Sequence, residues 1–303
     1  MDRDPDVRAG MQERPTFLCA LADDTPGRVV EATRWLANEL DARIVLAHAF
    51  DAMAIQVPAS RELAYARVTS EQLAQRERAR VRKLLDRSAG RLAAIPHTTA
   101  VGDGPPVPVL LGLAAEHQAR LVVTGTATPG PLDRVLVGSV SSELATKATC
   151  PVVVVPEDAM LAATGPVVAG YDGSSDSLRA ARHSAALAAR LERELVLVHV
   201  TDAAAEDVRA DAQLARELQD AVSVIRPAAR ERQEATIAVA HGEPAERLAE
   251  VARERDAALV VTGTRGRGAV KSALLGSVSA GVVRRAGQPL VLVGPAADRI
   301  LPS

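Results

Sequence analysis

The stretch that decides the fold is Val260-Val-Thr-Gly-Thr-Arg-Gly-Arg-Gly268, followed after a short spacer by Gly276-Ser-Val-Ser279. Its apolar start is typical of a buried strand, and Gly276-Ser277 opens a segment with helical periodicity. Glycines let the main chain approach an anion closely, and the N–H groups at the start of a helix point toward it. Ser277 and Ser279 are of a type that caps helices, and a hydroxyl can also bind a phosphate oxygen. The stretch therefore predicts a strand that leads into a phosphate-binding loop. The alternative is a glycine-rich turn that binds nothing.

Parts of this stretch occur twice in the chain. The recurring motifs are Val122–Thr126 with Val260–Thr264, Gly138–Ser141 with Gly276–Ser279, and Ile44–His48 with Leu195–His199. The first two pairs are offset by 138 residues and the third by 151. The chain therefore contains one kind of domain twice. The change of offset predicts an insertion in the first half, between its second and fourth strands, near Phe50–Ser60.

In both halves, short apolar runs alternate with longer amphipathic segments. The predicted strands are 16–22, 43–49, 97–101, 120–124 and 152–155, then 167–171, 195–200, 236–240, 259–262 and 290–293. The predicted helices are 29–40, 61–94, 107–117 and 139–148, then 176–191, 206–231, 245–255 and 278–286. This alternation indicates a parallel sheet with helices on both faces. The predicted fold class is α/β, with two tandem, doubly wound, five-stranded domains of a Rossmann-like, nucleotide-binding kind.

The expected domain limits follow from these elements. They are a disordered leader at 1–14, a first domain at 15–156, a linker at 157–165, a second domain at 166–294 and a tail at 295–303. We further expect the two halves to form an intramolecular pseudo-dimer around their last strands, 152–155 and 290–293, because a bare apolar sheet edge is normally paired or covered.

The candidate site lies where the winding of such a sheet reverses, beyond the carboxyl ends of the strands. The glycine loop leaves the fourth strand of the second half at this edge, and Asp172 ends the first strand there. Two segments far apart in the sequence are thus predicted to meet in one crevice. The Asp172 carboxylate can accept hydrogen bonds from a ribose or a base. An N-cap or Asx-turn role at the start of the next helix is the alternative, and the two roles are compatible.

Composition excludes several classes of function. The formal net charge is −2 and aromatic residues make up 2%, so base-stacking platforms and broad basic faces are not expected. No apolar run has the length of a membrane span, and the charged start lacks a secretory pattern. Cys19 and Cys150 match no metal or redox spacing and are expected to be buried, reduced thiols. We therefore expect a cytoplasmic protein with no nucleic-acid or membrane partner.

The spacing Gly263-x2-Gly266-x9-Gly276-Ser277 resembles the ATP-binding signature of the universal stress protein family. The resemblance covers both halves and implies a tandem member, each domain being a five-stranded α/β unit that binds ATP. The ending Val168-Ala-Gly-Tyr-Asp172-Gly-Ser174 resembles the first-strand ending of the family, whose Asp contacts the nucleoside, and Val200 matches a position that lines the adenine. The implied cofactor-binding residues are Gly170, Asp172, Val200, Thr262, Gly263, Arg265, Gly266, Gly276, Ser277, Val278 and Ser279, together with Gly125, Gly138 and Ser139 of the first half.

The first half departs from this pattern. Counted back by 151 residues, Asp172 falls on Leu21, and the nearest acid, Asp23, needs a shift of two residues. Four residues of the second loop, Arg265, Gly266, Arg267 and Lys271, become Ala127, Thr128, Pro129 and Asp133. Gly125, Gly138 and Ser139 remain. The first site is therefore expected to bind nucleotide more weakly than the second.

These features predict an ATP-binding protein that acts through nucleotide-dependent conformation or assembly, without catalytic residues or a metal site. A role in stress or growth control is implied by the resemblance alone, as are ATP with or without Mg²⁺ and a further homodimer. One alternative is an ATP-pyrophosphatase-like adenylating enzyme, because Asp172-Gly-Ser-Ser-Asp-Ser177 partly resembles the Ser-Gly-Gly-x-Asp-Ser loop of that class. A scaffold with vestigial nucleotide sites is the other alternative.

Overall fold

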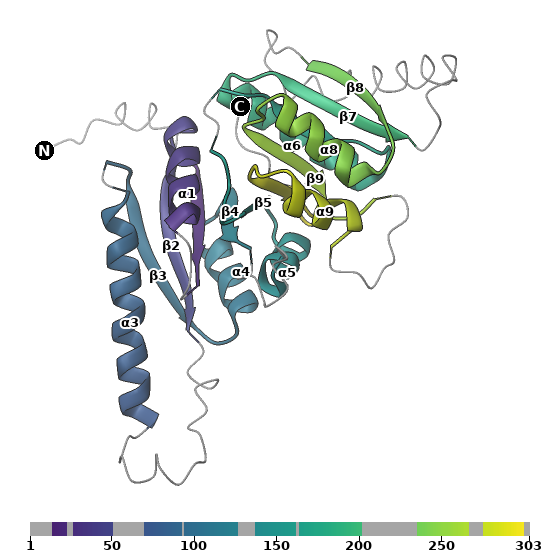
Figure 1. The fold of residues 1–303 in the computed structure, drawn as a ribbon. Helices are drawn as coiled ribbons and strands as arrows, with labels where there is room; N and C mark the ends of the chain where they lie inside the picture. Colours follow the sequence, from purple (N-terminus) through teal and green to yellow (C-terminus); the bar gives the residue numbers. More distant parts are fainter. Residues whose placement is uncertain are drawn as a thin grey trace, which may run out of the picture.

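The computed structural model describes residues 14–22, 27–50, 70–92, 94–126, 137–161, 164–201, 235–266 and 275–299. The strands are β1 (Thr16–Leu21), β2 (Arg43–Phe50), β3 (His97–Asp103), β4 (Leu121–Gly125) and β5 (Val152–Val155), then β6 (Val167–Gly170), β7 (Leu195–Thr201), β8 (Ala235–His241), β9 (Leu259–Gly263) and β10 (Leu290–Val293). The helices are α1 (Gly27–Glu39), α3 (Ser70–Gly90), α4 (Pro106–Glu116) and α5 (Ser139–Lys147), then α6 (Ser175–Leu191), α8 (Pro244–Glu254) and α9 (Ser277–Arg285). Figure 1 shows the two halves following one another along the sheet.

The strands form one sheet in the order β3-β2-β1-β4-β5-β10-β9-β6-β7-β8. Within each half all pairings are parallel. The direction in which successive strands are added to the sheet reverses between β1 and β4, and again between β6 and β9. The predicted fold class is therefore confirmed. Three predicted features lie outside the described residues: the leader up to residue 13, the helix at 206–231 and the region after Phe50 where the insertion was expected. The first nine residues of the helix predicted at 61–94 also lie outside them.

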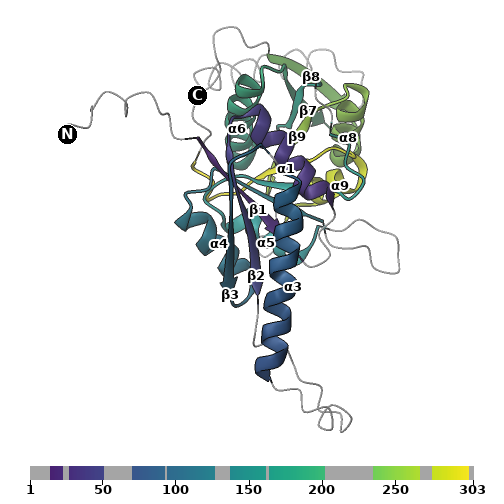
Figure 2. The same ribbon diagram turned by 90° about the vertical axis from the view of Figure 1, so that its left-hand side faces the viewer.

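Helices cover both faces of the sheet (Figures 1 and 2). One face packs against α1, α3 and α6 and the other against α4, α5, α8 and α9. Along each central strand, alternate residues enter the two cores: Phe17 and Cys19 belong to the first, and Leu18 and Ala20 to the second. This is why the central strands are continuous apolar runs rather than alternating ones.

The halves meet where β5 and β10 pair in antiparallel fashion. The pairing is centred on Val153 and Val291, which are equivalent positions of the repeat, and β5 is thus paired along the edge expected to need cover. Main-chain bonds continue the contact beyond the strands. The N–H of Met160 donates to the carbonyl of Gly287 at 2.7 Å, and the N–H of Arg299 donates to Thr149 at 3.2 Å. Each half therefore extends a segment beyond its last strand onto the other half.

The sheet register corrects one part of the repeat alignment. Phe17 pairs with Ile44 and Leu121, and Val167 pairs with Leu195 and Leu259. Phe17 and Val167 are thus equivalent, so the offset in the first strand is 150 and not 151. The residues that end α1 and α6 keep the offset of 151. The N–H of Ala42 donates to the carbonyl of Ala37, and the N–H of Arg193 makes the equivalent bond to the carbonyl of Ala188. A constant offset misses this one-residue difference between strand and helix.

The register has a direct consequence for the first site. The counterpart of Asp172 is Ala22, not Leu21, and Asp23 is one residue out of register rather than two.

The register also narrows the range of residues in which the insertion of the first half can lie. Ile44 pairs with His97 and Leu195 with Ala235, so the offset is already 138 at the third strand of each half. The extra residues of the first half therefore lie between β2 and β3.

Cys19 and Cys150 are buried, unpaired thiols on opposite faces of the sheet. Burial raises the pKa of each to about 12. Both thiols therefore stay protonated at neutral pH and poorly nucleophilic.

Across the part of the chain that is described, no helix has both the length and the apolar character needed to cross a membrane.

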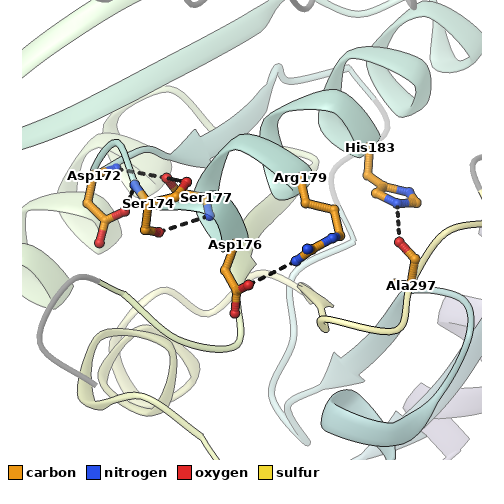
Figure 3. A network of polar contacts seen from close by, with 7 residues as sticks. All are labelled: Asp172, Ser174, Asp176, Ser177, Arg179, His183 and Ala297. Carbon is orange, nitrogen blue, oxygen red and sulfur yellow. Dashed lines mark hydrogen bonds and ion pairs between the residues drawn. The ribbon is translucent and has the colours of Figure 1, made fainter. Parts of the chain in front are cut away.

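A buried histidine joins α6 to the segment after β10. His183 is 3% exposed, and its Nε2 lies 3.1 Å from the carbonyl oxygen of Ala297 (Figure 3). Burial lowers the pKa of His183 below its ordinary value of 6.5, and nearby Arg179 adds to the lowering. The Ala297 carbonyl and Asp298 act in the opposite direction but do not cancel it. The folded protein therefore holds this side chain neutral where an unfolded chain would bind a proton.

We expect this histidine to make stability depend on pH. Below pH 6.5 the unfolded state binds the proton more readily than the folded state, so the free energy of unfolding should fall as pH falls and level off below the folded pKa. His183→Gln, which keeps a donor but does not titrate in this range, should show a smaller decline. Urea unfolding of both proteins on either side of pH 6.5 measures the difference. Equal declines in the two proteins would show that His183 does not contribute.

Candidate functional site

The candidate site lies at the carboxyl ends of β6 and β9, which are neighbours in the sheet. Tyr171 and Asp172 follow β6, and Thr264, Arg265 and Gly266 follow β9. The two segments come together as the sequence predicts. A Cβ atom at position 266 would lie 2.5 Å from Asp172 Oδ2, closer than such contacts allow. Glycine at 266 therefore makes room for the aspartate of the neighbouring strand.

Asp172 is held in a turn that leads into α6 (Figure 3). The N–H of Ser174 donates to Asp172 Oδ1 at 3.0 Å, which is an Asx turn. Ser174 is the N-cap of α6, and its hydroxyl accepts from the N–H of Ser177 at 3.1 Å. The predicted turn role of Asp172 is thus present. Oδ1 takes part in this turn, and the other carboxylate oxygen, Oδ2, lies toward Gly266 of the glycine loop.

The loop after β9 is pinned at both ends by main-chain contacts. A Cβ atom at Gly263 would lie 2.9 Å from the carbonyl carbon of Asp176, so α6 packs directly on this glycine. The N–H of Thr264 donates to Val293 at 3.2 Å, and its carbonyl accepts from the N–H of Gly276 at 2.8 Å. The end of β9 and the start of α9 are therefore in direct contact. Residues 267–274 between them, including Arg267 and Lys271, lie outside the described residues.

The start of α9 has the features of an anion site. Its N-cap, Gly276, provides no side-chain cap for the first-turn N–H groups. Ser277 is exposed and Val278 is half-buried. Uncapped N–H groups and the helix dipole both favour a negative charge at this position.

Ser279 and Thr262 serve the site by holding it together. Both are buried, and Thr262 Oγ1 donates to Ser279 Oγ at 3.1 Å. Ser279 Oγ in turn donates to the carbonyl of Gly263 at 2.8 Å. The first half repeats the bond, from Ser141 to Gly125, at 2.7 Å. The resemblance implies that Thr262 and Ser279 bind the cofactor; in the structure, their hydroxyls attach α9 to β9.

Two buried polar atoms of the loop stand out. Thr264 Oγ1 and Arg265 Nε are both buried, and neither has a hydrogen-bond partner in the described part of the protein. Thr264 as a whole is 0% exposed. Burying a polar group without a partner is costly, so such atoms point to a partner that lies outside the described residues. Sequence reasoning missed Thr264; the signal was a hydroxyl residue between Gly263 and Gly266.

Gly170 and Val200 lie near the carboxyl ends of β6 and β7, on the face of the sheet that α8 covers. A Cβ atom at Gly170 would lie 2.9 Å from Leu248 Cδ2 of that helix. Val200, on β7, is half-buried and packs against the core that α8 and α9 share. Gly170 therefore lets α8 pack closely at the end of β6, two residues before Asp172.

The first half keeps only part of this arrangement. Gly138 is the N-cap of α5 without a side-chain cap, and Ser139 begins the helix, as in the second half. Gly125 ends β4. Ala22 stands where the second half has Asp172, so this carboxylate is missing from the register. Residues 127–136, which include the substitutions Thr128, Pro129 and Asp133, lie outside the described residues.

Within the residues that the structure describes, no group of three or more histidine, cysteine, aspartate or glutamate side chains could hold a metal ion.

We expect Ser279→Ala to destabilise the second half. The change removes the acceptor of buried Thr262 and the donor to Gly263, so the free energy of unfolding should fall by about 1–3 kcal/mol. Ser277→Ala, an exposed change on the same helical turn, is the matched control and should stay within about 0.5 kcal/mol. Denaturant unfolding measures both. Equal stability of the two variants would mean that the Ser279 bonds do not hold α9.

Comparison with known proteins agrees with this architecture. The model of the universal stress protein family matches residues 14–156 and 164–294. A universal stress protein from Mycolicibacterium smegmatis is 31% identical over 275 residues, which cover 87% of this chain and 92% of that protein. One from Mycobacterium tuberculosis is 34% identical over 204 residues, or 62% of this chain and 65% of that protein.

A solved structure shows the same fold. The crystal structure of a universal stress protein from Archaeoglobus fulgidus aligns with a TM-score of 0.64, over 93% of this chain and 99% of that chain, at 18% identity. With both halves of the chain matched, the protein belongs to the universal stress protein family as a tandem two-domain member.

Proposed function

We propose that the second half binds ATP, with or without Mg²⁺, and that the protein regulates stress or growth responses through nucleotide-dependent conformation or assembly. The observation that carries the proposal is the meeting of Asp172 with Gly266, beside the uncapped start of α9. A carboxylate that accepts hydrogen bonds and a set of backbone N–H donors thus flank one loop. A nucleotide offers the complementary groups, with hydroxyls or an amine at one end and phosphates at the other.

The residues present fit such a ligand. The N–H groups at the start of α9 and the glycine loop would hold the phosphates, and Arg265 would supply a positive charge. Asp172 would accept from the ribose or the base, because a carboxylate can only accept. Thr264 Oγ1 and Arg265 Nε are buried and would gain the partners they lack within the described chain.

We propose regulation rather than catalysis. Two acids lie against the described glycines of the loop, and both are engaged, Asp176 with Arg179 at 2.9 Å and Asp172 with the Ser174 N–H. The adenylating alternative assigned chemistry to the segment from Asp172 to Ser177. The hydroxyls of Ser174 and Ser177 instead bond to main-chain groups of the turn after β6 and of the first residues of α6, which favours a positioning role over a chemical one. Release of AMP and pyrophosphate from ATP would support the enzyme and contradict this proposal.

The scaffold alternative places function in assembly alone. We propose that the β5–β10 pairing forms an intramolecular pseudo-dimer, since its register relates equivalent residues of the repeat as a two-fold interface would. A homodimer would use another surface, because β5 and β10 already pair with each other.

The buried, reduced thiols are consistent with action in the cytoplasm. Nucleic acid and membranes are not among the proposed partners.

The two sites should respond differently to an acid at the start of the helix. Gly276→Asp places a negative charge beside the proposed phosphates and should abolish tight ATP binding, whereas Gly138→Asp should leave it intact. The first site should be weaker by roughly ten- to a hundredfold, because it lacks the cations of the second loop. Calorimetric titration with ATP measures both variants.

A size control is needed because a Cβ atom at position 276 would lie 3.2 Å from the Thr264 carbonyl. Gly276→Asn has the same size as the aspartate but no charge, so the difference between these variants isolates electrostatic repulsion. If Gly276→Asp and Gly138→Asp bind ATP alike, the proposed inequality of the two halves is wrong.

A further inference from the structure

We infer that Ser177, in the first turn of α6, is a positioning residue that sets the Asp172 carboxylate for the ligand. The inference rests on the proposed function, and it assigns part of the nucleotide affinity to a hydroxyl that does not itself face the glycine loop.

Ser177 connects two main-chain segments through one oxygen atom (Figure 3). Its side chain is buried, with 4% of the residue exposed. Its Oγ donates to the carbonyl of Ser174 at 3.0 Å and accepts from the N–H of Asp172 at 3.3 Å. The hydroxyl therefore links the helix start to the main chain of Asp172, immediately after β6.

The carboxylate of Asp172 is fixed from the other side of the same turn. Its Oδ1 accepts from the N–H of Ser174, and the turn passes through Gly173 at a φ of +77°, a conformation that favours glycine. With the main chain held by Ser177 and Oδ1 held by Ser174, Oδ2 has little choice of direction. It faces Gly266, where a Cβ atom would lie 2.5 Å from it, so a larger residue there would force the carboxylate to shift.

The sequence of the first half has no hydroxyl at the position equivalent to Ser177. Depending on whether the strand or the helix offset is used, the counterpart of Ser177 is Gly27 or Pro26, and neither has a hydroxyl. The helix in this place is α1, described from Gly27 to Glu39. The same half also has Ala22 in place of Asp172. The serine and the aspartate thus occur together in one half and are both missing from the other, as expected if the serine serves the aspartate.

The competing explanation is that Ser177 only stabilises α6. Ser184 provides a matched control within the same helix. It is 0% exposed and its Oγ donates to the carbonyl of Ala181 at 2.8 Å, the same bond to the third preceding residue that Ser177 makes to Ser174. This bond stays within the helix. Ser184→Ala should therefore reproduce the structural cost without the effect on the ligand.

The test is a double-mutant cycle on the full chain, with ATP as the probe. Calorimetry is applied to the wild type, Ser177→Ala, Asp172→Ala, the double variant and Ser184→Ala, and melting temperatures are recorded for each. Ser177→Ala should weaken ATP binding by about three- to tenfold, the effect of losing one hydrogen bond. In the Asp172→Ala background it should have no further effect. Ser184→Ala should lower the melting temperature and leave the affinity unchanged.

Two results would overturn the inference while leaving the proposed function in place. One is unchanged affinity of Ser177→Ala for ATP, and the other is the same loss with and without Asp172. Absence of ATP binding by the wild type would instead overturn the proposed function, and the inference with it. Should Ser177→Ala fail to fold, Ser177→Cys takes its place in the cycle, because a thiol has similar shape but bonds weakly.

Discussion

The parallel pairing of β6 with β9 is the interaction on which the site depends. It places the ends of two strands, which are far apart in the sequence, side by side at the point where the winding of the sheet reverses. Asp172 enters from one strand and the glycine loop from the other. The described ends of the loop are fixed, because Ser279 attaches α9 to Gly263 and Thr264 is bonded to both Val293 and Gly276. The geometry of the site is thus inherited from the sheet.

The same sheet order in both halves makes their differences informative. Both keep the hydroxyl bond between the helix start and the strand end, at Ser141 and at Ser279. Both also begin that helix with a glycine that provides no cap. What the first half lacks is the set of groups that would face a nucleotide, beginning with Asp172. The framework of the site is therefore present in both halves, whereas the side chains that we propose to face the ligand are present in one, which is why we propose binding in the second half.

Much of the fold could be predicted because its central strands are buried on both faces. Such strands are apolar throughout, so runs such as Val152–Val155 can be recognised as strands in the sequence, and glycines indicate the turns between elements. The register could not be derived by counting. The repeat offset is 150 residues at Phe17 and 151 residues at the end of α1, a difference of one residue between the strand and the helix. Only the pairing of β1 with β2 and β4 reveals this difference. The same limit applies to side-chain direction. Ser279 matches a ligand-binding signature, yet its hydroxyl points to Gly263. The burial of the Thr264 hydroxyl oxygen is seen in the structure and could not be inferred from the sequence.

The central claim is that one of the two halves carries the nucleotide site. The most direct test is the number of ATP molecules that the intact chain binds at concentrations well below those that would fill a site ten- to a hundredfold weaker. Equilibrium dialysis of the purified protein, after removal of any nucleotide carried through purification, gives this number. The account predicts one ATP per chain in this range. Two ATP molecules bound with equal affinity, or none, would contradict it.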